Sequence, residues 1–104
     1  MIPSKTIKDL IHKHSILEKE LSSGNVDKKK FAEKSKEYAD LNEIIPDAKK
    51  YLSFEIERLD LEKILTEQSN DEDLKKMAEA ELNDLKEEFE KNEKKLKLYL
   101  LPKD

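Results

Sequence analysis

Apolar residues recur at steps of three and four along most of this 104-residue chain, and polar residues fill the positions between them. That spacing places side chains on one face of an α-helix, and it predicts three helices, over residues 4–22, 27–68 and 71–100. In the first helix, Ser4 is the expected N-cap and Gly24 the expected left-handed residue after its end. Its apolar stripe comprises Ile7, Leu10, Ile11, His14, Leu17 and Leu21.

The second predicted helix opens after Asp27, a good N-cap, and its apolar stripe crosses a proline. Pro46 would either break the helix at Ile45 or kink it, because proline removes one backbone hydrogen bond and clashes with the preceding turn. The apolar phase continues past Pro46 and no Gly or Asn flanks it, which favours one long bent helix. The stripe comprises Phe31, Ser35, Tyr38, Leu41, Ile45, Leu52, Ile56 and Leu59, and Lys63 is in phase to extend it.

The third predicted helix carries the seam of a coiled coil. Its apolar positions alternate in steps of four and three, and they are Ala78, Leu82, Leu85, Phe89, Asn92, Leu96 and Tyr99. Asn92 is the polar step of this seam, and it is either a buried residue that sets the register or a partly exposed one. Ser69 and Glu72 have the spacing of a capping box at the start, and Pro102 closes the helix.

Short turns between the helices require that neighbouring helices run antiparallel. The predicted fold is therefore all-α, an elongated antiparallel three-helix bundle with coiled-coil-like long second and third helices. We expect residues 1–104 to form a single helical domain, in which the shorter first helix covers only part of the other two. Leu and Ile number 23 and Val and Thr only three, which favours helix over strand. Phe31, Phe54 and Phe89 are expected in the core.

The composition excludes most classes of enzyme. Charged residues make up 44% of the chain, against about 25% in an average domain, and the net charge is −4. A single glycine rules out P-loop and dinucleotide-binding fingerprints, and the absence of Cys leaves no thiolate chemistry. No apolar run approaches the length that spans a membrane. We expect no cofactor, no metal and no membrane partner.

No residue stands out as catalytic. His12 and His14 lie two positions apart, so on a helix they point in different directions and cannot share a metal site. Acidic runs such as Glu87-Glu88 are interpreted as surface, because general acid–base catalysis needs a partly desolvated cleft that a slim bundle does not offer. The prediction is a chain that is not an enzyme, and no partner-binding residue is assigned.

Charge is distributed unevenly along the chain. Residues 1–52 carry 11 basic and 9 acidic groups, a balance of +2, and residues 53–104 carry 10 basic and 16 acidic groups, a balance of −6. The run Lys28-Lys29-Lys30 with Lys34 could touch a phosphate backbone, although a solvated helix face is the favoured interpretation. With Arg58 as the single arginine, sequence-specific nucleic-acid recognition is not expected.

Three stretches resemble one family. Residues 35–51, Ser-Lys-Glu-Tyr-Ala-Asp-Leu-Asn-Glu-Ile-Ile-Pro-Asp-Ala-Lys-Lys-Tyr, resemble the second helix of bacterial class I peptide chain release factors. Residues 74–82 resemble an acidic Leu-x-x-x-Ala-x-x-Glu-Leu stretch of that family. Residues 97–104 resemble the Leu-Pro-Lys-Asp junction at which the helical first domain meets the decoding domain, and this ending favours the type 1 factors, which read UAA and UAG. The similarity covers nearly the whole chain in the right order.

The resemblance implies a role in translation termination without the chemistry. The family hydrolyses peptidyl-tRNA through a Gly-Gly-Gln loop and reads stop codons through a Pro-x-Thr motif, and neither motif occurs in this chain. By implication, the chain is the N-terminal domain of a longer cytoplasmic factor and an auxiliary module that docks on the ribosome near the stalk base of the large subunit. The alternative is a stand-alone helical coiled-coil adaptor that binds a protein partner.

Overall fold

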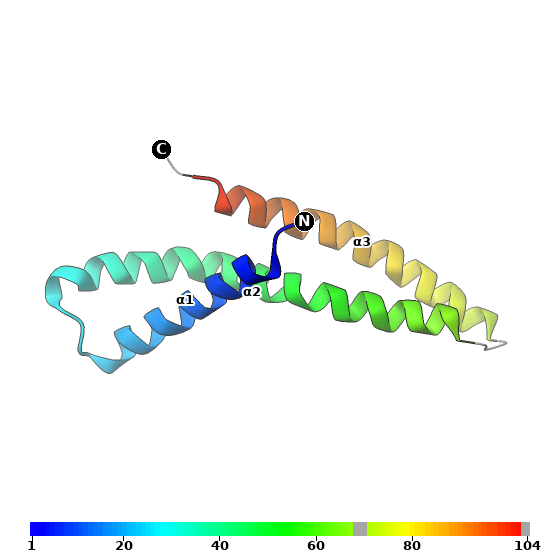
Figure 1. Ribbon diagram of the computed structural model, residues 1–104, viewed down its shortest axis with the longest axis horizontal. Coiled ribbons are helices and arrows are strands. Elements are labelled where there is room, and N and C mark those ends of the chain that lie inside the picture. The colour runs from blue at the N-terminus through cyan, green and yellow to red at the C-terminus, as the bar shows by residue number, and fades with distance from the viewer. Residues whose placement is uncertain (68–70, 103–104) are drawn as a thin grey trace. The chain divides into compact units, whose positions relative to one another are not determined.

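The computed structural model describes residues 1–67 and 71–102. These residues form three α-helices and no strand: α1 (Ser4–Ser23), α2 (Lys28–Thr66) and α3 (Glu72–Leu100), shown in Figure 1. The predicted all-α fold is confirmed. The chain divides into two compact units, Met1–Lys49 and Lys50–Asp104, so that α2 contributes its first half to one unit and its second half to the other.

Helix α1 begins one residue earlier than its predicted cap implies. Ser4 is already helical, and the N-cap position is Pro3, whose carbonyl oxygen accepts hydrogen bonds from the backbone N–H of Thr6 and Ile7 at 3.0 and 3.4 Å. The prediction of Ser4 as the N-cap is therefore wrong, because extended Pro3 (φ −58°, ψ 136°) already supplies the non-helical residue. The other end is as predicted, with Gly24 in the left-handed conformation at φ 73°.

Helix α2 is continuous through Pro46. A proline inside a helix costs about 3 kcal/mol, whereas burying one isoleucine side chain contributes about 1.5–3 kcal/mol. Ile44 and Ile45 are both buried beside the exposed Pro46, so apolar burial offsets the cost of the proline. At the start of the helix, the Asp27 carboxylate accepts a hydrogen bond from the Lys29 backbone N–H at 3.3 Å, as the N-cap prediction requires. The predicted end at residue 68 lies outside the described residues.

Helix α3 begins after Asp71, whose side chain accepts a hydrogen bond from the Leu74 backbone N–H at 3.0 Å. The predicted capping residue, Ser69, lies outside the described residues. All seven predicted seam residues are buried or half-buried. Asn92 is among the buried ones, so the alternative of a partly exposed polar step is wrong.

In the first unit, α1 and the first half of α2 run antiparallel. Lys13 forms an ion pair with Glu37, and Glu20 forms one with Lys34, so residue numbers rise on one helix as they fall on the other. The buried apolar residues of this unit are Ile2, Ile7, Leu17, Leu41, Ile44, Ile45 and Ala48.

In the second unit, the second half of α2 and α3 also run antiparallel. The Phe89 ring lies between two aromatic residues of α2, with centroid distances of 5.3 Å to Tyr51 and 5.4 Å to Phe54. Lys50 forms an ion pair with Glu88 at 3.4 Å, and Leu61, later in α2, lines the same groove as Leu85, which is earlier in α3. Tyr51, Phe54, Ala78 and Leu96 are the buried apolar residues.

Three residues predicted on the apolar stripe of α2 are not in the core. Phe31 is 49% exposed, Ile56 is 64% exposed, and Leu59 is also exposed. In the second unit, the buried face of α2 carries Tyr51 and Phe54, and Ile56 lies two residues beyond Phe54, roughly 200° around the helix. The predicted stripe after Pro46 is therefore wrong at Ile56 and Leu59, whereas Leu52 is half-buried.

Candidate functional site

Neither histidine belongs to a catalytic or metal-binding cluster in the described part of the chain. His14 is half-buried, where its ring stacks on Tyr38 at 4.8 Å and its Nε2 lies 2.5 Å from Asn42 Oδ1. His12 is exposed on a different side of α1. Within residues 1–67 and 71–102, no three side chains of His, Cys, Asp or Glu are placed so as to hold a metal ion. The surfaces of the two units are therefore the candidate functional sites.

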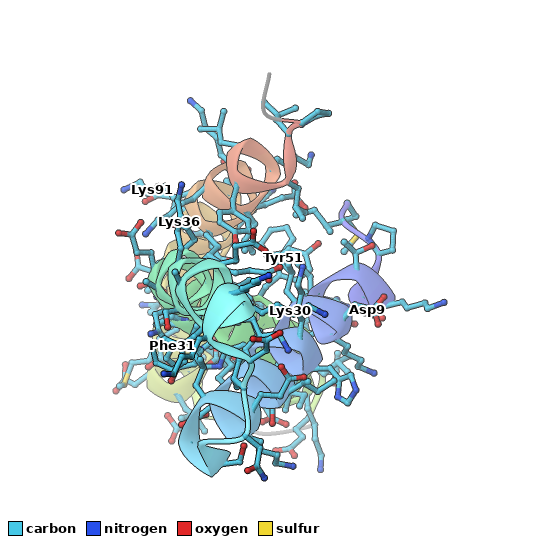
Figure 2. The ribbon with its side chains drawn as sticks, turned by 90° about the vertical axis from the view of Figure 1, so that its left-hand side faces the viewer. Asp9, Lys30, Phe31, Lys36, Tyr51 and Lys91 are labelled. Atoms are coloured by element: carbon cyan, nitrogen blue, oxygen red, sulfur yellow. The ribbon has the colours of Figure 1, made fainter. Side chains whose placement is uncertain are left out.

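A basic surface lies at the start of α2. Lys28, Lys29 and Lys30 are all exposed there, and Phe31 beside them is half exposed; Figure 2 labels Lys30 and Phe31. Cations at a helix N-terminus oppose the helix dipole, so the stability of α2 does not account for these lysines. Lys34, predicted as the fourth member, instead pairs with Glu20. The basic surface consequently comprises Lys28, Lys29 and Lys30.

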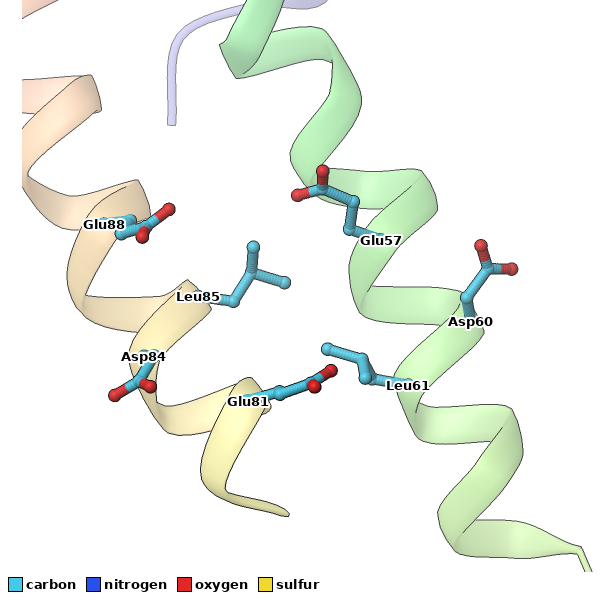
Figure 3. A pocket seen from close by; sticks show the side chains of 7 residues that line it. All are labelled: Glu57, Asp60, Leu61, Glu81, Asp84, Leu85 and Glu88. Carbon is cyan, nitrogen blue, oxygen red and sulfur yellow. The ribbon is translucent and has the colours of Figure 1, made fainter. Parts of the chain in front are cut away.

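An acidic groove lies between α2 and α3 in the second unit. Its volume is about 420 Å³, and it is lined by Glu57, Asp60, Leu61, Glu81, Asp84, Leu85 and Glu88. Figure 3 shows the two leucines pointing toward each other between the helices, with the carboxylates of Glu57 and Glu81 also directed into the space. Asp60 and Asp84 lie at its outer edges.

Within the part of the chain that the structure describes, cations form ion pairs with the groove carboxylates only at one end. Glu88 pairs with Lys50 at 3.4 Å. No cation of the described residues lies within ion-pair distance of Glu57, Asp60, Glu81 or Asp84. A groove lined by charges of one sign above an apolar floor concentrates its electric field and favours a partner of the opposite sign.

Sequence reasoning missed this groove and predicted that a slim bundle offers no cleft. The carboxylates are on the surface as predicted, but several of them gather at one place. The sequence contains two patterns that lead to this groove. On α2, Glu57 and Asp60 are three positions apart, so they share one helix face. On α3, Glu81, Asp84 and Glu88 recur at steps of three and four and also share one face. Combining them required knowing that α2 and α3 bring these two faces together.

The single arginine is occupied within its own helix. Arg58 donates hydrogen bonds to Glu55 at 2.5 Å and to Glu62 at 2.8 Å. The hydrogen bond to Glu55, followed by that to Glu62, raises the pKa of the Arg58 guanidinium above its ordinary value. A guanidinium held by two carboxylates is not available for bidentate recognition of a base or a phosphate.

A second, smaller groove follows the end of α3. It has a volume of about 320 Å³ and is lined by Glu90, Glu93, Lys94, Lys97, Leu98 and Leu101. Leu98 is 62% exposed, and Lys97 pairs with Glu93 at 3.3 Å. Its charges are of both signs, so it selects no class of partner by charge.

Comparison with known proteins identifies the family. The model of the PCRF domain matches residues 10–104, which is nearly the entire chain. The chain belongs to the PCRF domain family. This PCRF domain is 71% identical, over all 104 of its residues, to a protein of Pelagibacter ubique named Peptide chain release factor 1, of which it covers 29%. A protein of the same name from Agathobacter rectalis is 42% identical over 100 residues, covering 94% of the chain and 28% of that relative.

The resemblance to bacterial release factors is thus confirmed, and both relatives carry the name of the type that the Leu-Pro-Lys-Asp ending favours. The PCRF domain spans less than a third of the length of these relatives. No solved structure matches it. None of its helices, over the residues described, is long and apolar enough to cross a membrane.

Proposed function

We propose that this PCRF domain takes part in translation termination as the N-terminal domain of a type 1 peptide chain release factor, which acts at UAA and UAG codons in the cytoplasm. The domain docks the factor on the ribosome near the stalk base of the large subunit and performs no chemistry itself. One observation carries the proposal: the whole chain is 71% identical to a protein named Peptide chain release factor 1.

The surfaces of the domain support docking. General acid–base chemistry needs carboxylates or imidazoles in a partly desolvated site, whereas the groove carboxylates Glu57, Asp60, Glu81, Asp84 and Glu88 are all exposed. The exposed Lys28-Lys29-Lys30 surface suits the phosphate backbone of ribosomal RNA, and the acidic groove of the second unit would be repelled by it. The two units thus offer contacts of opposite charge for a particle that is built of RNA and protein.

A release assay tests this role. Ribosomes programmed with a stop codon are titrated with the full-length factor and with a factor that lacks residues 1–100. A docking domain contributes binding energy equally to the ground state and the transition state, so its removal raises the half-saturating concentration and leaves turnover within a few-fold. A collapse of turnover at saturating factor, with circular dichroism showing that the truncated factor is folded, would contradict the docking role.

The second candidate is a stand-alone helical adaptor that binds a protein partner. The acidic groove with its apolar floor favours this candidate, because such a surface can bind a protein without any ribosome. Reading the gene beyond codon 104 separates the two candidates. Codons for Gly-Gly-Gln further along the same reading frame support the release factor, and a stop codon at position 105 supports the adaptor.

A further inference from the structure

The acidic groove of the second unit continues into an exposed apolar surface on α3. Met77 lies four positions before Glu81 and seven before Asp84, so the three residues share one face of the helix. Met77 is 61% exposed, and Leu74, three positions before it, is also exposed. This face, defined by Leu74, Met77, Glu81, Asp84, Leu85 and Glu88, is hereafter the acidic face of α3.

The acidic face combines apolar and charged residues in an arrangement on which another amphipathic helix can pack. Its apolar residues lie at one end and along the floor, and its carboxylates line the sides. Leu74 and Glu88 are 14 positions apart, a distance of about 21 Å along the helix axis. That length corresponds to roughly four helical turns, and a groove between two antiparallel helices is a surface into which a third helix packs.

We propose that the groove between α2 and α3, together with the acidic face of α3, binds an amphipathic helical segment of a basic protein. Apolar residues of that segment pack on Leu61, Leu85 and Met77, and its lysines or arginines pair with the carboxylates beside them. Glu57 and Glu81 contribute most, because their carboxylates are directed into the groove and have no cation at ion-pair distance within the described residues. The inference concerns this surface alone and does not rest on the proposed docking role.

Other occupants fit the surface less well. Nucleic acid carries the same sign of charge as the carboxylates. A metal ion would need several of them gathered around one point, and no such group occurs among the residues that the structure describes. A second copy of this chain would have to supply a basic amphipathic helix, but its net charge is −4, and the lysine-rich end of α3, residues 91–97, also carries Glu93, which pairs with Lys97.

The test measures binding of a synthetic amphipathic peptide built from Lys, Leu and Ala, about four helical turns long, by fluorescence anisotropy at about 0.15 M salt. The peptide binds the wild-type chain, and Glu57→Gln/Glu81→Gln weakens that binding about tenfold, a loss of roughly 1.4 kcal/mol. The matched control, Glu79→Gln/Glu90→Gln, removes the same charge from exposed positions on the opposite side of α3 and changes the affinity less than about twofold.

A second pair of variants tests whether the exposed apolar residues of the acidic face contribute to peptide binding. Met77→Ser weakens binding several-fold, whereas Leu98→Ser, which removes an equally exposed apolar side chain at the other end of α3, has no effect. A peptide of identical composition, with its leucines distributed around the helix, binds more weakly. Circular dichroism of each variant shows that it is folded.

Three results would overturn the proposal. The first is equal weakening by both double variants, which would mean that the peptide responds only to net charge. The second is equal affinity for the two peptides, or no binding of either. The third is self-association of the chain in sedimentation velocity that Glu57→Gln/Glu81→Gln abolishes, because the occupant would then be a second copy.

Discussion

The edge of one phenylalanine ring meets the face of another between α2 and α3: the Phe54 and Phe89 centroids are 5.4 Å apart, with an interplanar angle of 88°. Edge-to-face pairs of this kind add about 0.5–1.5 kcal/mol beyond the burial of their area. Phe54 is buried and Phe89 is half-buried, so α2 provides the enclosed part of the contact. The pair fixes the facing sides of the two helices in the second unit, next to the acidic groove.

Replacing Phe89 by alanine should therefore destabilise the chain by about 2–4 kcal/mol, near the lower end of the range for buried phenylalanines because the ring is half-buried. Glu87→Ala, two positions earlier on the exposed side of α3, should change the free energy of unfolding by less than about 0.5 kcal/mol. Urea melts of the two variants give the comparison. A larger loss for Glu87→Ala than for Phe89→Ala would mean that α3 presents a different face to α2.

The turn after α1 makes a second prediction possible. Gly24 has φ 73°, and a Cβ placed on it would meet nothing within 4 Å. Gly24→Ala should therefore destabilise the protein only through the strain of a left-handed backbone at a residue with a Cβ, about 1–2 kcal/mol. Gly24→Asn should cost less, since asparagine tolerates this conformation. Thermal melts of both variants check the order, and equal melting temperatures for the alanine variant and the wild type would argue against a left-handed Gly24 in solution.

Local signals were enough to predict the helices. The φ of Gly24, the capping carboxylate of Asp27 and the seam from Ala78 to Tyr99 each depend on residues within a few positions of one another. The exposed side of α2 could not be predicted in this way. Ile56 and Leu59 continue the stripe of Leu41 and Ile45 in phase, yet the buried face in the second unit carries Tyr51 and Phe54. Periodicity identifies an apolar face, but only the position of a neighbouring helix decides which face is covered.

The acidic groove shows the same limit at the candidate site. Glu57 and Glu81 are 24 positions apart, and they line one groove only because α2 and α3 run antiparallel in a particular register. The sequence indicates each acidic face separately. A shift of one residue in that register would rotate the facing side chains and separate them.

Removing the proline inside α2 should stabilise the protein. Proline in a helix interior destabilises the helix by about 3 kcal/mol, because it removes a backbone hydrogen bond and clashes with the preceding turn. Pro46→Ala restores the missing backbone N–H. The opposing effect is smaller, because proline restricts the unfolded chain by only about 0.4–1 kcal/mol. A net gain of roughly 2–2.5 kcal/mol is expected in urea melts. Lys49→Ala, an exposed replacement three positions later, serves as the control and should leave the midpoint nearly unchanged. A loss of stability in Pro46→Ala would mean that the proline shapes a bend on which the packing of α2 depends.

The basic surface at the start of α2 allows stability and function to be separated. Lys30 is the third residue after the cap Asp27, so Lys30→Glu creates the Asp-x-x-Glu spacing of a capping box and places an anion at the positive end of the helix dipole. The isolated chain should gain roughly 0.5–1 kcal/mol in urea melts. If the lysines contact ribosomal RNA, the same substitution in the full-length factor should raise the half-saturating concentration in the release assay and reduce its dependence on salt. Lys91→Glu reverses an equal charge at an exposed position within α3 and should change neither quantity appreciably. A stabilised variant that engages ribosomes as well as the wild type does would show that Lys30 makes no contact with the ribosome.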